Sequence, residues 1–199
     1  MPKAAPADGP SAPAPAALPV AGAPRPQRAD AARNRARVLA AARDLFAERG
    51  VAGVTMEEIA RAAGVAKGTV FHRFGDRAGL ALALLDEHER ELQERILRGP
   101  PPLGPGAPPR ERLLAFLEAL TALTVEHRDL LLEVERPLGA RYRTGAYQAW
   151  LQHTVLLLGD DDALRAHLLL APLAADLVAH LVEQGVTTAE LVAALRVPA

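Results

Sequence analysis

The sequence predicts an all-α protein of about nine helices, arranged as a small N-terminal three-helix domain followed by a larger helical body. Three observations support this fold class. Apolar residues recur at helical spacing along most of the chain, no segment shows the alternating pattern of a β-strand, and capping residues and glycines lie between the periodic segments. With 199 residues, half of them hydrophobic, the chain suits one domain or two small domains that share a core.

Residues 1–28 differ in composition from the rest of the chain. Prolines stand at positions 2, 6, 10, 13, 15, 19, 24 and 26, and alanine fills many of the positions between them. Proline has no backbone donor, and alanine offers little side chain to bury. We therefore expect residues 1–28 to form a disordered or extended arm.

Three helices are predicted within residues 29–76. Asp30 can cap the first, which carries an apolar stripe and ends before Gly50. The second begins at a capping box formed by Thr55 and Glu58 and ends at Gly64. The third is short and covers about residues 66–74. The pattern indicates a compact N-terminal domain.

Longer helices are predicted within residues 77–199. Asp76 can cap a fourth helix that runs to about residue 98, and the proline- and glycine-rich segment 99–109 then breaks the chain. Further helices are expected over about 110–135, 137–158, 160–184 and 188–196. Pro172 falls inside the helix over 160–184 and is expected to kink it.

The net charge of −1 hides an uneven distribution. Residues 25–77 hold 11 Lys/Arg and 6 Asp/Glu, a net of +5, whereas residues 78–199 hold 11 and 17, a net of −6. A basic domain on an acidic body is the asymmetry expected when one end of a protein meets a polyanion. Solvated surface charges would produce the same imbalance, so charge alone leaves both interpretations open.

Few residues are suited to catalysis. The chain has no cysteine, and its one serine, Ser11, lies in the predicted arm, so the folded part lacks thiol and serine nucleophiles. No histidine follows an acidic residue by three positions, as helical di-metal sites require. We therefore expect no enzyme activity, no metal ion and no cofactor.

The sequence also indicates a cytoplasmic location. No apolar run approaches the roughly 18 residues of a membrane span, and prolines interrupt the N-terminus where a signal peptide would need an apolar region. The absence of cysteine fits a reducing compartment.

The stretch GVAKGTVFHRF, residues 64–74, is the most informative segment. A phosphate-binding P-loop needs four residues between its glycines and a lysine after the second, whereas here three residues intervene and Lys67 precedes the second glycine. A helix-turn-helix fits better, because the short turn Gly64-Val65 joins the second and third predicted helices. A packing turn with solvated charges is the remaining alternative.

In a helix-turn-helix, the second helix enters the major groove of DNA with its N-terminus first. Lys67 can donate to guanine, Thr69 offers a hydroxyl and a methyl group to base edges, and Gly68 allows the backbone to approach closely. His72 and Arg73 lie about one turn later, within reach of phosphates or further bases. The chain has only two lysines against 21 arginines, so a lysine at position 67 suggests a specific requirement.

A longer pattern extends on both sides of this stretch. It consists of Gly50, Val54-Thr55-Met56, Ile59-Ala60, the unbroken run 63–74, Asp76-Arg77 and Leu80. This pattern resembles the DNA-binding domain of tetracycline-repressor (TetR) family regulators and covers about residues 30–85. The body is similar to the family only in the number and lengths of its helices.

The resemblance implies DNA-contact roles for eight residues, which are Thr55, Lys67, Gly68, Thr69, Phe71, His72, Arg73 and Arg77. Arg77 stands where family members commonly carry a lysine that meets phosphate. Two positions depart from the family pattern, because Ala66 replaces a common Ser or Thr and Phe71 replaces a common Tyr. We expect both departures to weaken contacts with the DNA backbone and to leave the base-facing donors unchanged.

The resemblance further implies a homodimer that binds a palindromic operator and a small effector that releases the DNA. The last two helices of each subunit would form a four-helix interface. Its apolar faces would come from Leu164, Leu168, Ala171, Ala175, Val178, Leu181, Leu191 and Leu195. Burial of these residues within one subunit explains the pattern equally well.

Helical spacing suggests candidate effector contacts. Tyr142, Trp150 and His153 share one face of the helix over 137–158, and Phe116 and His127 are placed to oppose them. The same residues fit a packed core; if they line a pocket, it suits a mostly apolar ligand. The predicted function is a DNA-binding repressor released by such a ligand. An effector-independent activator or architectural DNA-binding protein of the same build is the alternative.

Overall fold

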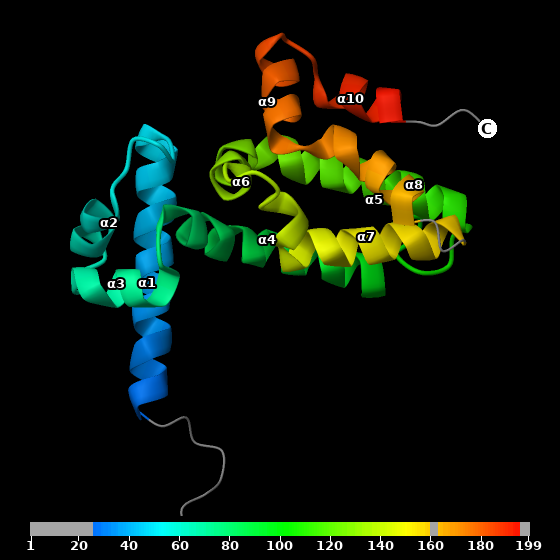
Figure 1. The fold of residues 1–199 in the computed structure, drawn as a ribbon. Coiled ribbons are helices and arrows are strands. Elements are labelled where there is room, and N and C mark those ends of the chain that lie inside the picture. The colour runs from blue at the N-terminus through cyan, green and yellow to red at the C-terminus, as the bar shows by residue number, and fades with distance from the viewer. Residues whose placement is uncertain (1–25, 160–162, 196–199) are drawn as a thin grey trace, which may run out of the picture.

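The computed structural model describes residues 26–159 and 163–195. In these two ranges the chain forms ten α-helices and two short 3-10 turns, without a β-strand. The predicted all-α fold class is confirmed. Figure 1 shows two parts, a small N-terminal group of helices and a larger helical body.

The N-terminal domain contains α1 (Pro26–Arg49), α2 (Met56–Ala62) and α3 (Lys67–Phe74). Helix α1 is the long axis of this domain; in the view of Figure 1, α2 lies to its left and α3 passes across it. Helix α4 (Arg77–Arg98) runs from this domain into the body. Because α4 belongs to both parts, its orientation determines how the N-terminal domain is held.

The body is completed by α5 (Pro109–Glu126), α6 (Arg128–Glu135), α7 (Gly145–Leu158), α8 (Ala163–Leu170), α9 (Ala175–Glu183) and α10 (Thr188–Leu195). Two 3-10 turns connect them, η1 (Arg141–Arg143) before α7 and η2 (Ala171–Leu173) between α8 and α9. Helices α5 and α7 run along α4, and α9 and α10 lie at one edge (Figure 1).

Local capping explains where several helices begin. The Thr55 hydroxyl accepts from the Glu58 backbone N–H at 3.3 Å, and the Glu58 carboxylate accepts from the Thr55 N–H at 2.9 Å. This is the predicted capping box, which satisfies two free donors at the start of α2. The Asp76 carboxylate accepts from the Gly79 N–H at 2.8 Å and caps α4, also as predicted.

Two hydrophobic cores are present, and α4 contributes to both. Leu80 and Leu84 pack with residues of α1, α2 and α3, including the fully buried Ile59 and Val70. Four other residues of α4 belong to the body core, together with residues of α5, α6, α7 and α9. These four are Ala81, Leu85, Leu92 and Ile96. Helix α4 therefore links the two cores.

Several helix boundaries differ from the prediction. Helix α1 begins at Pro26, four residues before Asp30, so the end of the predicted arm is helical. Residues 1–25 lie outside the described part of the chain. The segment 110–135 divides at His127, the C-cap of α5, and the helix predicted from 137 begins only at Gly145, where the Thr144 hydroxyl accepts from the Tyr147 N–H at 3.1 Å.

Pro172 interrupts the helix over 160–184 instead of kinking it. The chain forms η2 around this proline, and α9 begins afterwards at Ala175. Residues 160–162, at the predicted start of that helix, lie outside the described part of the chain. By composition alone, residues 163–183 are long and apolar enough to cross a membrane. In the fold, however, they form two short helices that pack on α5, α6 and α7, and this does not indicate a membrane protein.

Candidate nucleic-acid interface

The turn between α2 and α3 sets the position of the third helix. Gly64 has φ +62°, a left-handed conformation that glycine adopts without strain. The Val65 N–H donates to the Ala60 carbonyl at 3.0 Å and closes the turn. Arg37 of α1 donates through Nε to the Ala63 carbonyl at 2.9 Å and through Nη2 to the Gly64 carbonyl at 2.6 Å. Arg37 therefore holds the turn against α1.

Helix α3 has one buried face and one open face. Val70 is fully buried, and Phe74 packs partly buried against the N-terminal core. The open face carries Lys67, Gly68, Thr69, Phe71, His72 and Arg73, all exposed. These are six of the eight residues predicted to contact DNA, and the structure brings them together on one helix.

At the N-terminus of α3, the positive charge of Lys67 is partly neutralised by an acidic side chain. The Lys67 ammonium forms an ion pair with Glu57 of α2 and lies 5.4 Å from the centre of the Phe71 ring. Its hydrogen bond to Glu57 is the main reason that the pKa of this carboxyl lies below its usual value. Both groups are well exposed, so Lys67 can exchange Glu57 for a base or a phosphate.

Ala66, at the N-cap of α3, makes no side-chain capping bond. The expected loss of a cap at this position is therefore present in the fold. Phe71 is 37% exposed and lies under Lys67, so its ring supports the lysine on the open face. At the other end of α3, Arg73 donates to the Ala31 carbonyl of α1 at 3.4 Å, beside a groove that also includes Arg35 and Asn34.

Two predicted DNA contacts are engaged elsewhere. Arg77 donates to the Glu133 carboxylate of α6 through Nε at 2.9 Å and Nη2 at 3.2 Å, and to the Ala52 carbonyl at 3.1 Å. Its guanidinium therefore connects α4 to the body instead of extending the open face of α3. The Thr55 hydroxyl is used in the capping box and donates to Glu58 at 2.8 Å. The partner of Arg77 is 56 positions away, so no local pattern could have identified it.

The five predicted effector residues do not line one common cavity. Phe116 and Trp150 are buried in the body core, and the His153 ring meets the Phe116 ring edge-on at 4.9 Å. Tyr142 is 52% exposed on η1, where it meets the Tyr147 ring edge-on at 5.1 Å. It therefore does not share the inner face of α7, because that helix begins only after η1.

His127 lies at the junction of the two domains. Its ring stacks on that of His88 at 4.0 Å, and both histidines border a cavity of about 370 Å³ between α1, α4 and α6, which we call the junction cavity. Burial lowers the pKa of His127, and the neighbouring His88 lowers it further. His127 thus borders the junction cavity, which none of the other four predicted effector residues lines.

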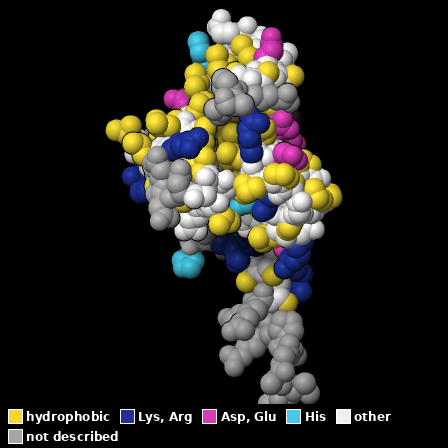
Figure 2. All heavy atoms as spheres, turned by 90° about the vertical axis from the view of Figure 1, so that its right-hand side faces the viewer, with side chains coloured by type: hydrophobic (Ala, Val, Ile, Leu, Met, Phe, Trp, Pro, Cys, Tyr) yellow, Lys and Arg dark blue, Asp and Glu magenta, His cyan; other side chains and the backbone are white. Residues whose placement is uncertain are grey.

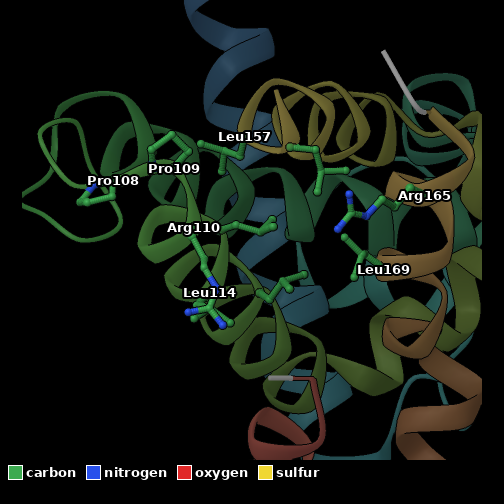
Figure 3. Close-up of a pocket in the computed structure, with 10 residues that line it drawn as sticks. Pro108, Pro109, Arg110, Leu114, Leu157, Arg165 and Leu169 are labelled. Atoms are coloured by element: carbon green, nitrogen blue, oxygen red, sulfur yellow. The ribbon is translucent and has the colours of Figure 1, made fainter. Parts of the chain in front are cut away.

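A second cavity, of about 560 Å³, lies between α5, α7 and α8, and none of the five predicted residues lines it. Figure 3 shows its leucine walls and two arginines. We call it the α5–α7–α8 cavity. Sequence reasoning missed it because it searched for aromatic and histidine faces, whereas this cavity is lined by aliphatic residues from helix ends.

The predicted dimer residues fall into three groups by exposure. Leu164 and Leu168 stand one turn apart on α8 and are 68% and 64% exposed, and Ala171 is also exposed. Ala175 and Val178 are instead buried within the chain, at 0% and 1% exposure. They therefore cannot contact a partner and are removed from the list of candidate interface residues. The remaining members are partly buried and are Leu181, Leu191 and Leu195.

The described residues hold no cluster of three or more His, Cys, Asp or Glu side chains suited to a metal ion. Two buried polar atoms in this part of the chain lack a hydrogen-bond partner, Arg112 Nε and His153 Nε2. Burial lowers the pKa of His153, and the positive charge of Arg112 adds to this effect.

A three-helix domain that presents a basic helix N-terminus on a glycine turn defines a helix-turn-helix DNA-binding protein. Residues 38–84 match the model of the bacterial regulatory proteins of the tetR family. The chain is 30% identical over 156 residues to the HTH-type transcriptional activator FasR of Mycolicibacterium smegmatis, across 75% of this chain and 69% of FasR. The chain belongs to the tetR family of transcriptional regulators.

Other similarities are shorter or concern the fold alone. The chain is 38% identical over 63 residues to the HTH-type transcriptional repressor AcnR of Corynebacterium efficiens, a match that spans 32% of this chain and only 34% of AcnR. The fold is similar to that of the transcriptional regulator FadR from Bacillus subtilis in complex with stearoyl-CoA. That similarity has a TM-score of 0.55 at 18% identity and covers 80% of this chain and 92% of FadR.

Proposed function

We propose that the protein is a homodimeric, sequence-specific regulator that binds a palindromic operator in the cytoplasm and is released from it by a small, mostly apolar ligand. The observation that carries the proposal is the open face of α3, where Lys67, Gly68 and Thr69 are exposed on a helix anchored by Val70. This arrangement suits direct contact with base edges in the major groove. The body, which contains the α5–α7–α8 cavity, supplies the ligand-binding part.

A dimer supplies the second recognition helix that a palindrome requires. Two copies of α3 must lie about 34–36 Å apart to enter successive major grooves of B-DNA. The exposed Leu164 and Leu168 on α8 offer an apolar stripe for a two-fold interface. Sedimentation at micromolar concentration is expected to show a dimer, and a monomer would contradict this part of the proposal.

Ligand release would act through α4. A ligand that prefers one orientation of α4 in the body core also changes the spacing of the two α3 helices, because Leu80 and Leu84 of α4 pack in the N-terminal core. A differential affinity of about 3 kcal/mol would change DNA affinity by roughly two orders of magnitude. FadR, which has a similar fold, has been solved in complex with stearoyl-CoA, and this supports a small-molecule ligand for this protein.

The central experiment is selection of binding sites from random DNA by the full chain, repeated in the presence of metabolite extract. We expect an inverted repeat to be enriched and its binding to weaken when extract is added. Enrichment of no sequence would contradict the DNA-binding function. An enriched operator whose binding no extract changes would favour the effector-independent alternative.

A second candidate function is activation of transcription, which the similarity to the activator FasR favours. Transcription in vitro from a promoter that carries the selected operator distinguishes the two directions. Repression is expected to lower transcript yield when the protein is added, whereas activation would raise it.

A further inference from the structure

The α5–α7–α8 cavity has mainly aliphatic walls. Leu113, Leu114 and Leu117 come from α5, Leu157 and Leu158 from α7, and Leu169 from α8, with Pro108 and Pro109 at the start of α5. Leu117 and Leu157 are buried and lie deepest, whereas the other leucines are half-buried. The volume of about 560 Å³ lies within the range of roughly 300–1,000 Å³ typical of small-molecule sites. The walls suit a hydrocarbon chain.

Among the described residues, the two charged side chains that border this cavity are both cationic. Arg110 comes from the first turn of α5 and Arg165 from the first turn of α8, and no acidic residue is among the described residues that line the cavity. Figure 3 shows the Arg165 side chain extending from α8 into the space between the helices. On the face of the body seen in Figure 2, hydrophobic side chains lie between Lys or Arg side chains.

Both guanidiniums also have other contacts within the protein. A guanidinium has five N–H donors in a fixed plane, so it can keep a protein contact and bind a ligand oxygen at the same time. The α5 N-terminus at Pro108 and Pro109 borders the same cavity and adds positive potential there. The described lining residues therefore offer cationic donors at the mouth and an apolar interior.

We infer that the α5–α7–α8 cavity binds an amphipathic anion, an aliphatic chain that ends in a carboxylate, with Arg165 and Arg110 holding the carboxylate. This inference rests on the proposed function, since it specifies the chemical class of the effector. The chain lies along the leucines of α5 and α7, and the carboxylate remains near the first turns of α5 and α8. An effector bound there would contact α5 and α7, which contribute to the same body core as α4.

Two other regions of the molecule suit this ligand less well. The region around Phe116 and Trp150 is filled by side chains that are 0% and 6% exposed. The junction cavity is bordered by two acids, Glu126 and Asp129, against the single cation Arg43. An anion therefore prefers the α5–α7–α8 cavity on both space and charge.

The test uses the full chain and three probes with the same ten-carbon tail: decanoate, decanol and decyltrimethylammonium. Calorimetry is expected to show that decanoate binds about tenfold or more tightly than either of the others, because charge-assisted hydrogen bonds to Arg165 and Arg110 are absent for them. Arg165→Gln and Arg110→Gln are each expected to lower the affinity for decanoate by about tenfold and to leave the affinity for decanol unchanged. Arg98→Gln serves as the control, since Arg98 is an exposed arginine at the end of α4 that pairs with Glu94.

A variant that fills the part of the cavity proposed for the aliphatic chain distinguishes loss of the ligand site from loss of the fold. Leu169 lines the cavity at a half-buried position, and Leu169→Trp reduces the cavity volume. The variant is expected to weaken the binding of both decanoate and decanol, while the helical circular dichroism signal stays unchanged. Equal binding of all three probes, or undiminished decanoate binding in both arginine variants, would overturn the inference and leave the proposed function intact. Decanoyl-CoA as a fourth probe distinguishes a free acid from a thioester, because only the free acid presents its carboxylate to the arginines.

Operator binding is measured separately with the same probes. Arginine-dependent decanoate binding that releases the operator supports both proposals. Arginine-dependent binding without any change in operator affinity supports the site and contradicts the ligand-released mechanism.

Discussion

Arg77 and Glu133 join the N-terminal domain to the body by a two-point ion pair. The guanidinium donates to both carboxylate oxygens, at 2.9 Å and 3.2 Å, and Glu133 is only 8% exposed. Arg136 donates to the same carboxylate at 2.6 Å, and Arg77 also donates to the Ala52 carbonyl before α2. The start of α4, the loop before α2 and helix α6 are therefore fixed relative to one another by a single arginine.

Arg77→Ala is expected to destabilise the protein by about 2–3 kcal/mol, because it leaves a buried carboxylate without its two-point partner. A double-mutant cycle with Glu133→Ala is expected to give a coupling energy of about 1–3 kcal/mol in urea unfolding. The same variant changes the connection between the domains, so we also expect a weaker response of operator binding to ligand.

The ion pair between Arg43 and Glu87 provides a matched control. It joins α1 to α4, with 2.9 Å between the Arg43 Nη2 and Glu87 Oε2 atoms, and its side chains are 58% and 41% exposed. Its coupling energy is expected to stay below about 1 kcal/mol, as for other exposed ion pairs. Equal coupling in the two cycles would show that burial gives the Arg77–Glu133 pair no special role.

The N-terminal domain was largely predictable because its determinants are local. The capping box of Thr55 and Glu58, the Asp76 cap and the inward position of Val70 each depend on residues within one or two helical turns. The open face of α3 follows from the same spacing. Short-range periodicity was therefore sufficient to assemble six of the eight candidate DNA contacts on one surface.

The body was less predictable because its determinants are distant in sequence. Whether His127 faces the core or the junction depends on His88, and the partner of Arg77 lies on another helix. Ala175 has the same periodicity as an interface residue but is buried by neighbouring helices. Periodicity identifies the apolar face of a helix but does not identify which element covers it.

Lys67→Ala is expected to lower the preference for the cognate operator over random DNA by about 1–3 kcal/mol, because Lys67 is placed to donate to a base edge. Fluorescence anisotropy with both DNAs measures this preference. Equal loss on cognate and random DNA would assign Lys67 to phosphate contact. Glu57→Gln tests the same contact from the other side, because it removes the carboxylate whose ion pair Lys67 must break to bind DNA. This variant is expected to bind DNA more strongly.

Gly68→Ala tests whether DNA approaches the backbone of α3. A Cβ atom at this position meets nothing within 4 Å in the free protein, so the substitution is expected to stabilise the fold by up to about 1 kcal/mol. DNA affinity is expected to fall, because the methyl group occupies space that the groove needs. Gly145→Ala on α7 is equally open and is the control, with unchanged DNA affinity expected. Undiminished DNA binding by Gly68→Ala would place the DNA away from this residue.

Glu89 on α4 makes stability depend on pH. The side chain is 9% exposed in the body, and burial, with a smaller effect of Asp86, raises the pKa of this carboxyl from 4.5 to about 7. The raised pKa means that the folded protein binds a proton that the unfolded chain has lost. The contribution of Glu89 to stability is therefore full below pH 4.5 and is lost as the pH rises through about 7.

Glu89→Gln removes this titration and keeps a side chain of similar shape. The variant is expected to exceed the parent in free energy of unfolding by about 2–3 kcal/mol at pH 8 and by less than about 1 kcal/mol at pH 5. Urea unfolding at pH 5, 6, 7 and 8 measures the difference. The lowered pKa values of His127 and His153 act in the opposite direction, with stability lost as the pH falls, but they are common to both proteins and cancel. A stability difference that does not change with pH would mean that Glu89 titrates normally in the folded protein and that its carboxylate reaches solvent.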